Sequence, residues 1–288
     1  MSMEFLYHYT TAEGLIGIVE KQEFWATDLA YMNDTTEFRV GLDLVTEHIE
    51  QLRGRDSGQY AERWNWLLTA LRRTREFGPD TLSSVYACSF STDGDNLSQW
   101  RAYCPNGGFA IGLPRTTLGT IARRQKWLAL ERCIYDTDEQ EVAIKKTVED
   151  TLQNMAEVQD ETVSFVTPNE QQECSTRRLL LWRLMRKAAV CKNVAFREED
   201  EWRLVAMCTS YPEEADIVRF RCRTGLVVPY WPIELDRGRW GQWDSITVVV
   251  GPTPRLDESL ASIRRFLSAR CHNCRIDVRQ SKVPYRYW

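Results

Sequence analysis

Histidine is scarce in this chain, which has only three among its 288 residues: His8, His48 and His272. The sequence also contains no Walker motif, no G-x-G-x-x-G pattern and no G-x-S-x-G pattern. These absences leave little support for P-loop chemistry, for a Rossmann dinucleotide site, or for a serine or cysteine nucleophile activated by histidine. A catalytic site in this chain would have to rely on other residue types.

Long apolar runs and an excess of positive charge are also missing. No stretch approaches the ~20 apolar residues of a membrane span, and the first residues lack the basic region of a signal peptide. The net charge of −4 and a pI near 5.6 argue against non-specific nucleic-acid binding. The nine cysteines are scattered, mostly in apolar segments typical of reduced, buried thiols. We therefore expect a soluble cytoplasmic protein without a membrane partner.

Hydrophobic periodicity predicts helices interleaved with short strands in the first half of the chain, and mainly strands in the second half. The predicted strands cover residues 5–9, 24–27, 84–90, 107–113, 127–135, 202–208, 217–223, 226–235, 246–250 and 275–280. The main predicted helices cover residues 37–52, 60–71, 96–104, 144–155, 176–192 and 257–270. This pattern indicates an α+β fold in a single domain over residues 1–288, with a possible helical insert or lid at 136–192.

The opening unit, residues 7–37, contains more polar residues than a core element needs. His8 lies in a strand-like aromatic run, and Thr10 or Thr11 is a candidate N-cap for the next helix, with Glu13 at capping-box spacing from Thr10. A free helix N-terminus favours an anion. A lone histidine is more often one more packed ring, but several polar residues share this unit: Thr10, Asn33, Asp34 and Glu37.

A first candidate site combines His8 with Tyr86 or Tyr103 and the acidic run at 198–201. Glu199 and Glu201 would point to the same side of a strand, because side chains alternate with a period of two. Two such carboxylates repel, which raises the pKa of one of them. The simpler alternative is that Glu201 pairs with Arg203 or with an arginine of a neighbouring strand.

A second candidate site is the segment 89–113. Asp95 is placed to cap a short helix that carries Trp100, Arg101 and Tyr103. An aromatic platform of this kind suits the stacking of a flat ring. The alternative is that the two aromatic side chains belong to the core between helix and sheet.

The stretch Cys271-His272-Asn273-Cys274 is a third candidate, for a metal ion. A single C-x-x-C can begin a zinc site, but no second pair of ligands follows at zinc spacing. We therefore expect no metal cofactor.

Six ordered motifs resemble a widespread bacterial family known only as a domain of unknown function that opens with YHYT. The motifs are YHYT at residue 7, N-D-x-x-E at 33, S-F-S-x-x-x-D-x-x-x-x-W-x-x-Y at 89, F-x-x-E-x-E-W-R at 196, V-G-P at 250 and S-K-V-P-Y-R at 281. They extend over nearly the whole chain.

The chain also resembles, more distantly, the ADP-ribosyltransferases. The opening His8-Tyr9-Thr10 is similar to the segment whose histidine binds the adenosine ribose of NAD in that family. Tyr86, or Phe90 with Ser91, matches the strand tyrosine of the family, and Tyr103 matches its helix aromatic. Glu201 resembles the catalytic glutamate, and Glu199 completes the E-x-E arrangement of some transferases. The resemblance implies a split antiparallel sheet with flanking helices.

The resemblance also implies an activity and the rest of a site. NAD would be the substrate, and its nicotinamide–ribose bond would break through an oxocarbenium ion that Glu201 stabilises. Tyr103 or Trp100 would stack on nicotinamide, and Arg101 or Arg203 would meet the pyrophosphate. Asn33, Glu37 and Asp95 complete the expected NAD cleft. The acceptor would be a protein, a nucleic acid or water, in a toxin or phage-defence effector.

Two other functions remain open at this point. The same cleft fits a regulatory or defence module that binds a nucleotide or peptide without turnover. A metal-dependent nuclease would instead use a group of carboxylates around a divalent ion: Asp34, Glu37, Glu199 and Glu201.

Overall fold

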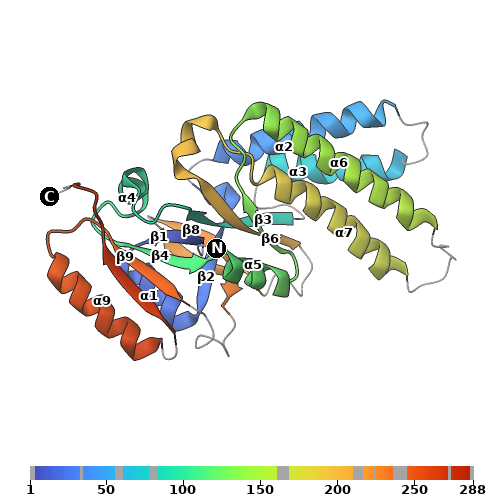
Figure 1. The fold of residues 1–288 in the computed structure, drawn as a ribbon. Coiled ribbons are helices and arrows are strands. Elements are labelled where there is room, and N and C mark those ends of the chain that lie inside the picture. The colour runs from blue at the N-terminus through green and yellow to red at the C-terminus, as the bar shows by residue number, and fades with distance from the viewer. Residues whose placement is uncertain are drawn as a thin grey trace.

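The fold is built around one large sheet with helices on both of its faces (Figure 1). The computed structural model describes residues 4–32, 35–55, 61–77, 83–160, 169–209, 217–223, 225–235, 245–271 and 274–285. In this part of the chain ten strands form a mixed sheet in which β9 and β10 pair in parallel and the other pairs are antiparallel. The predicted α+β class is confirmed.

The strands follow the order β10-β9-β4-β1-β3-β2-β8-β7, while β6 pairs with β3 and β5 pairs with β6. Their bounds are β1 (Phe5–Thr10), β2 (Glu23–Asp28), β3 (Ser83–Ser91), β4 (Phe109–Pro114), β5 (Leu128–Arg132), β6 (Glu201–Thr209), β7 (Arg219–Arg223), β8 (Leu226–Glu234), β9 (Ile246–Val250) and β10 (Ile276–Gln280). Each predicted strand is present, with ends that differ by up to three residues.

The described helices are α1 (Ala12–Lys21), α2 (Thr35–Arg53), α3 (Ala61–Phe77), α4 (Leu97–Tyr103), α5 (Arg115–Arg124), α6 (Thr137–Asp160), α7 (Asn169–Ala188) and α9 (Leu256–Arg270), with the 3₁₀ turns η1 (Leu29–Tyr31) and η3 (Val194–Glu199). Thr11 is the N-cap of α1, since its Oγ1 accepts a bond from the Gly14 amide at 3.2 Å. The capping box expected from Thr10 is therefore wrong. None of these helices, within the described ranges, is long and apolar enough to cross a membrane.

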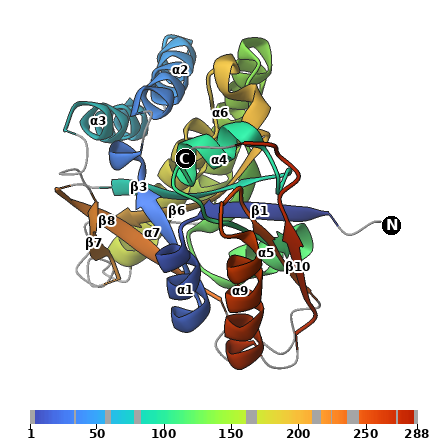
Figure 2. The same ribbon diagram turned by 90° about the vertical axis from the view of Figure 1, so that its left-hand side faces the viewer.

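Alternate residues of the central strands face two separate cores. In β3, Tyr86 and Cys88 pack with α1, α5 and α9, whereas Val85 and Ala87 pack with α2, α3, α6 and α7. This alternation follows from the two-residue period of a strand. Figures 1 and 2 show α1 and α9 on one side of the sheet, and α2, α3 and α6 on the other. The helices of the segment predicted as an insert, α6 and α7, thus contribute to the second core.

The sheet divides beside β3. Strand β6 pairs along all of β3, from Ser83 to Ser91, and occupies one of its edges. The other edge is shared: β2 pairs with Tyr86 and Ala87, and β1 pairs with Ser91. The backbone between these two contacts, at residues 88–90, faces a gap where β1 and β2 separate. We call this gap the fork.

Two helical glycines provide a test of the packing between α2 and α7. A Cβ at Gly41 would lie 2.3 Å from the Ala188 oxygen, whereas a Cβ at Gly17 would meet nothing within 4 Å. Alanine is favoured over glycine in a helix by about 1 kcal/mol. We expect Gly17→Ala to raise the free energy of unfolding by about 0.5–1 kcal/mol and Gly41→Ala to lower it by about 1–3 kcal/mol. Urea unfolding of both variants checks this, and equal stability would contradict the close approach.

Candidate functional site

A cavity of about 890 Å³ opens at the fork. Its wall is made by residues of β1, β2 and β3, by the start of α1, by α4, by the segment from Lys192 to Arg203, and by β7. The volume lies in the ~300–1,000 Å³ range of sites for small molecules and cofactors. Seven of the candidate site residues line it: His8, Tyr9, Thr10, Tyr103, Glu199, Glu201 and Arg203.

His8 is fixed by the fork itself. Its Nδ1 lies 2.9 Å from the Ser89 carbonyl oxygen, which belongs to the unpaired stretch of β3. A carbonyl only accepts, so Nδ1 carries the proton and Nε2 is left as the acceptor of the ring. The ring lies 5.4 Å from Phe24 and 5.7 Å from Phe90, measured between centroids. Burial lowers the pKa of His8, so the imidazole is neutral at pH 7.

Cys88 lies next to this histidine, with its Sγ 3.7 Å from Nδ1 of His8. Burial raises the pKa of the Cys88 thiol well above its usual range. The nucleophile in cysteine chemistry is the thiolate. A protonated thiol beside a neutral imidazole therefore does not form an activated nucleophile.

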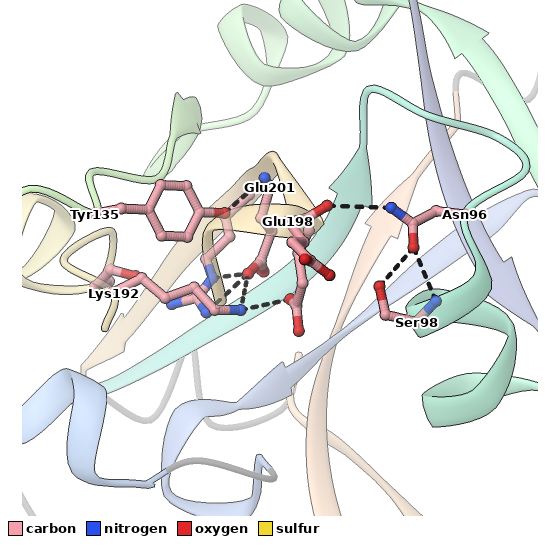
Figure 3. A network of polar contacts seen from close by, with 9 residues as sticks. Asn96, Ser98, Tyr135, Lys192, Glu198 and Glu201 are labelled. Carbon is pink, nitrogen blue, oxygen red and sulfur yellow. Dashed lines mark hydrogen bonds and ion pairs between the residues drawn. The ribbon is translucent and has the colours of Figure 1, made fainter. Parts of the chain in front are cut away.

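Glu201 is the most constrained charge of the cavity and is only 3% exposed. Its Oε1 accepts a bond from Arg203 Nε at 2.7 Å, and its Oε2 accepts from Arg203 Nη2 at 3.2 Å and from the Lys192 ammonium (Figure 3). The same ammonium donates to Glu199 at 2.6 Å. The Glu201 amide donates to the Tyr135 hydroxyl at 2.8 Å. Two carboxylates and two cations thus form a buried, electrically balanced group, which we call the ion cluster.

The predicted repulsion between Glu199 and Glu201 is therefore wrong. Burial alone would raise the pKa of Glu201, but Arg203 and then Lys192 overcome it and lower that pKa to about 2. The two glutamates do not share a strand face, because Glu199 ends η3 and Asp200 turns the chain in the left-handed region at φ 37°. The alternative prediction, a pair between Glu201 and Arg203, is confirmed.

The short helix α4 contributes one of its two candidate aromatics to the cavity. Tyr103 lines the wall, and burial raises the pKa of its hydroxyl to about 12. Trp100 is 1% exposed and packs edge-on against Tyr9 at 4.6 Å, in a small core away from the cavity lining. Arg101 is exposed and lies over the Tyr285 ring at 5.1 Å. Neither Trp100 nor Arg101 is placed to meet a ligand in this cavity.

Three further candidates have structural partners instead. Asp95 does not cap α4, since Asn96 does (Figure 3). Asp95 accepts bonds from Trp100 Nε1 at 2.9 Å and from the Lys282 amide at 2.6 Å, and so ties the C-terminal segment to α4. Tyr86 and Ser91 are each 3% exposed and do not line the cavity.

The candidates of the N-D-x-x-E motif cannot be placed in the same way. Asn33 and Asp34 lie outside the described residues. Glu37 belongs to α2, but its side chain lies outside the described set.

Several lining residues were missed by sequence reasoning: Trp25, Ser89, Lys192, Phe196, Arg221 and Arg223. One signal was available for Arg221 and Arg223, which lie in the alternating run R-F-R-C-R of β7. No pattern in the sequence marks Lys192 as a cavity residue, because it follows a basic helix and its contact with Glu201 depends on the tertiary fold.

A metal centre receives no support from these contacts. Lys192 lies between the carboxylates of Glu199 and Glu201 and donates to both, where a divalent ion would have to bind. Among the residues that the structure describes, no group of three or more His, Cys, Asp or Glu side chains could hold a metal ion. His272 and Asn273 of the C-x-x-C stretch lie outside those residues.

Comparison with known proteins finds one family model that matches part of the chain, and no activity. Residues 99–204 match a family described as a protein of unknown function (DUF2971). The matched stretch begins within α4 and ends in β6, so it includes Tyr103 and the whole ion cluster. No curated protein and no solved structure matches the chain.

The ion cluster predicts a large effect of a neutral substitution. Glu201→Gln leaves two buried cations facing one carboxylate, and breaking such a pair costs about 3–5 kcal/mol. The folded-state pKa of Glu201, about 2, is below its ordinary value of 4.5. Its contribution is therefore complete above pH 4.5 and is lost as the pH falls toward 2. Urea unfolding should show a stability difference from wild type that is full at pH 7 and smaller at pH 4 and below.

Glu198→Gln is the matched control, since Glu198 is exposed and its backbone carbonyl, which the substitution keeps, accepts the bond from Asn96 (Figure 3). We expect it to change the free energy of unfolding by less than about 0.5 kcal/mol. Equal effects of the two substitutions at pH 7 would contradict the ion cluster.

Proposed function

We propose that the cavity binds NAD and that the protein cleaves its nicotinamide–ribose bond, as an ADP-ribosyltransferase does. One observation carries this proposal: His8, Tyr103 and Glu201, which are far apart in the sequence, line a single cavity. They are the groups that the resemblance assigns to ribose binding, nicotinamide stacking and catalysis. The division of the sheet beside β3 is also what the split sheet of that fold would require.

The charge state of Glu201 supports its role. A carboxyl group with a pKa near 2 is ionised at pH 7, so it suits electrostatic stabilisation of a cation and not proton donation. A carboxylate has about four acceptor positions, and Arg203 and Lys192 donate three bonds to that of Glu201. A ribose hydroxyl would donate a further bond to this carboxylate. The oriented carboxylate would then lie beside the positive charge that develops on the ribose.

The neutral His8 suits the binding of the other ribose. With Nδ1 donating to Ser89, the remaining nitrogen accepts a bond from a hydroxyl group. Tyr103 lines the same cavity, and its aromatic ring would stack on the flat nicotinamide.

The reaction balances without a further cofactor. The bond between C1′ and the pyridinium nitrogen breaks, and nicotinamide leaves with the electron pair as a neutral molecule. A nucleophilic oxygen or nitrogen of the acceptor, or water, forms the new bond to C1′ and loses its proton to solvent. Glu201 stabilises the oxocarbenium ion between these two events.

One observation favours a second candidate, a binding module without turnover. Glu201 is nearly inaccessible, and both of its oxygens already accept bonds from cations. If these contacts do not loosen when a ligand binds, the cavity holds a nucleotide but does not cleave it. Glu201→Gln would then leave ligand binding unchanged.

The test is nicotinamide release from NAD by purified protein, with and without cell lysate as a source of acceptor. We expect release by wild type and by Glu198→Gln, and a loss of about 100-fold or more in Glu201→Gln. Tyr103→Leu, which leaves the ion cluster intact, should weaken NAD binding. Thermal melts must show that each variant is folded at the assay temperature.

Two results would reject the reaction. The first is the absence of release and of NAD binding by wild type under every condition. The second is unchanged release by a folded Glu201→Gln variant.

A further inference from the structure

Arg221, a cation of the cavity wall, has no carboxylate partner in the part of the chain that the structure describes. Arg221 of β7 lines the cavity, and its Nη2 donates to the Thr27 hydroxyl at 2.7 Å. Its guanidinium carbon lies 5.5 Å from the centroid of the Trp25 ring. Within the described ranges no carboxylate pairs with it. A half-buried guanidinium without an anion is unusual, because burial of a charge is costly unless it is paired.

Two buried polar atoms in the same wall lack partners. Among the described residues, Nε of Arg221 is shielded from solvent and has no hydrogen-bond partner, and the same holds for Oγ of Ser89. Both residues line the cavity. Buried donors are almost always satisfied in folded proteins, and a bound group that accepts hydrogen bonds would satisfy these two.

A second arginine lies beside Arg221 in the cavity wall. Arg223 also lines the wall and lies close enough to lower the pKa of Arg221, after the larger effect of burial. Arg219, on the same strand, is paired with Glu23 at 3.0 Å and does not line the cavity. At the other end, the ion cluster balances its own charges.

Cys88 is near both charged regions of the cavity. Burial raises the pKa of that thiol most, Arg221 lowers it and Glu201 raises it. Arg221 also lowers the pKa of His8, which lies beside Cys88. The cation of β7 and the ion cluster therefore act on the same part of the cavity wall.

The arginines considered from the sequence are not available for an anion. Arg101 is exposed and lies over Tyr285 outside the cavity. Arg203 uses Nε and Nη2 for Glu201 and Nη1 for the Ala189 carbonyl, at 2.7 Å. Arg221 has a free donor instead.

We propose that Arg221, with Arg223 beside it and the Ser89 hydroxyl, binds a phosphate group of a nucleotide ligand at the β7 end of the cavity. The assignment deepens the proposed function and rests on it for the nature of the ligand. A guanidinium suits this role because its donors match phosphate oxygens two at a time.

The test compares the binding of ADP, adenosine and inorganic pyrophosphate by isothermal titration calorimetry at fixed ionic strength. Wild type should bind ADP at least ten times more tightly than adenosine. Arg221→Gln should reduce the affinity for ADP about tenfold or more, since a charge-assisted hydrogen bond is lost, and should leave the affinity for adenosine unchanged. Pyrophosphate binding should depend on Arg221 in the same way.

Arg219→Gln is the matched control, because it removes the same charge from the same strand but outside the cavity. We expect it to change the affinity for ADP by less than twofold, with thermal melts confirming that both variants are folded. Equal losses in the two variants, equal wild-type affinities for ADP and adenosine, or no ADP binding would each overturn the phosphate site.

These results are separable from the proposed reaction, because none of the three probes contains nicotinamide. Binding of ADP that depends on Arg221, in a protein that releases no nicotinamide, would support the phosphate site and reject the transferase activity. Nicotinamide release that is insensitive to Arg221→Gln, together with equal binding of ADP and adenosine, would support the transferase activity and reject the phosphate site.

Discussion

The candidate site depends on the burial of one carboxylate, that of Glu201, between two cations. A buried ion pair is a weak source of net stability, since apolar residues of similar volume often serve as well, whereas loss of one partner is very costly. The cluster therefore constrains the fold more than it stabilises it. The cluster holds Lys192, which follows α7, against Glu201 at the start of β6. Arg203 adds a second link between these segments by donating to the Ala189 carbonyl. Ion pairs therefore hold the side chains of this wall of the cavity in place.

The opposite wall is held by backbone geometry. Because β1 and β2 separate beside β3, the Ser89 carbonyl has no strand partner at the fork, and the imidazole of His8 takes that place. The same gap that leaves a backbone group unpaired thus orients a ring and opens the cavity. A polar pocket in the middle of a sheet is possible here because one side chain satisfies the backbone that the missing strand would have satisfied.

Local patterns of the sequence were sufficient for the elements but not for the site. Strand and helix positions follow from periodicity. Strands β3 and β6 carry apolar residues on both faces, because one face packs in the first core and the other face packs in the second. The site required contacts between distant segments. Trp100 and Tyr103 have the same helical setting in the sequence, and only the packing of α4 against β1 decides that Trp100 is buried in a core. The prediction of repulsion between Glu199 and Glu201 was wrong for the same reason. Lys192, which follows α7, donates to both carboxylates, and this contact depends on the tertiary fold.

The distribution of charge in the cavity restricts the ligands that fit it. The ion cluster is neutral as a whole, and its two carboxylates, Glu199 and Glu201, both belong to residues that line the cavity. At β7, Arg221 has no carboxylate partner among the described residues and favours an anion. The neutral His8 adds no charge of its own. A purely anionic ligand would leave the Glu201 end unused, and a purely cationic one would be repelled by Arg221. The proposed ligand, a nicotinamide dinucleotide, carries both kinds of group, since its ribose and cationic ring would use Glu201 and its phosphates would use Arg221.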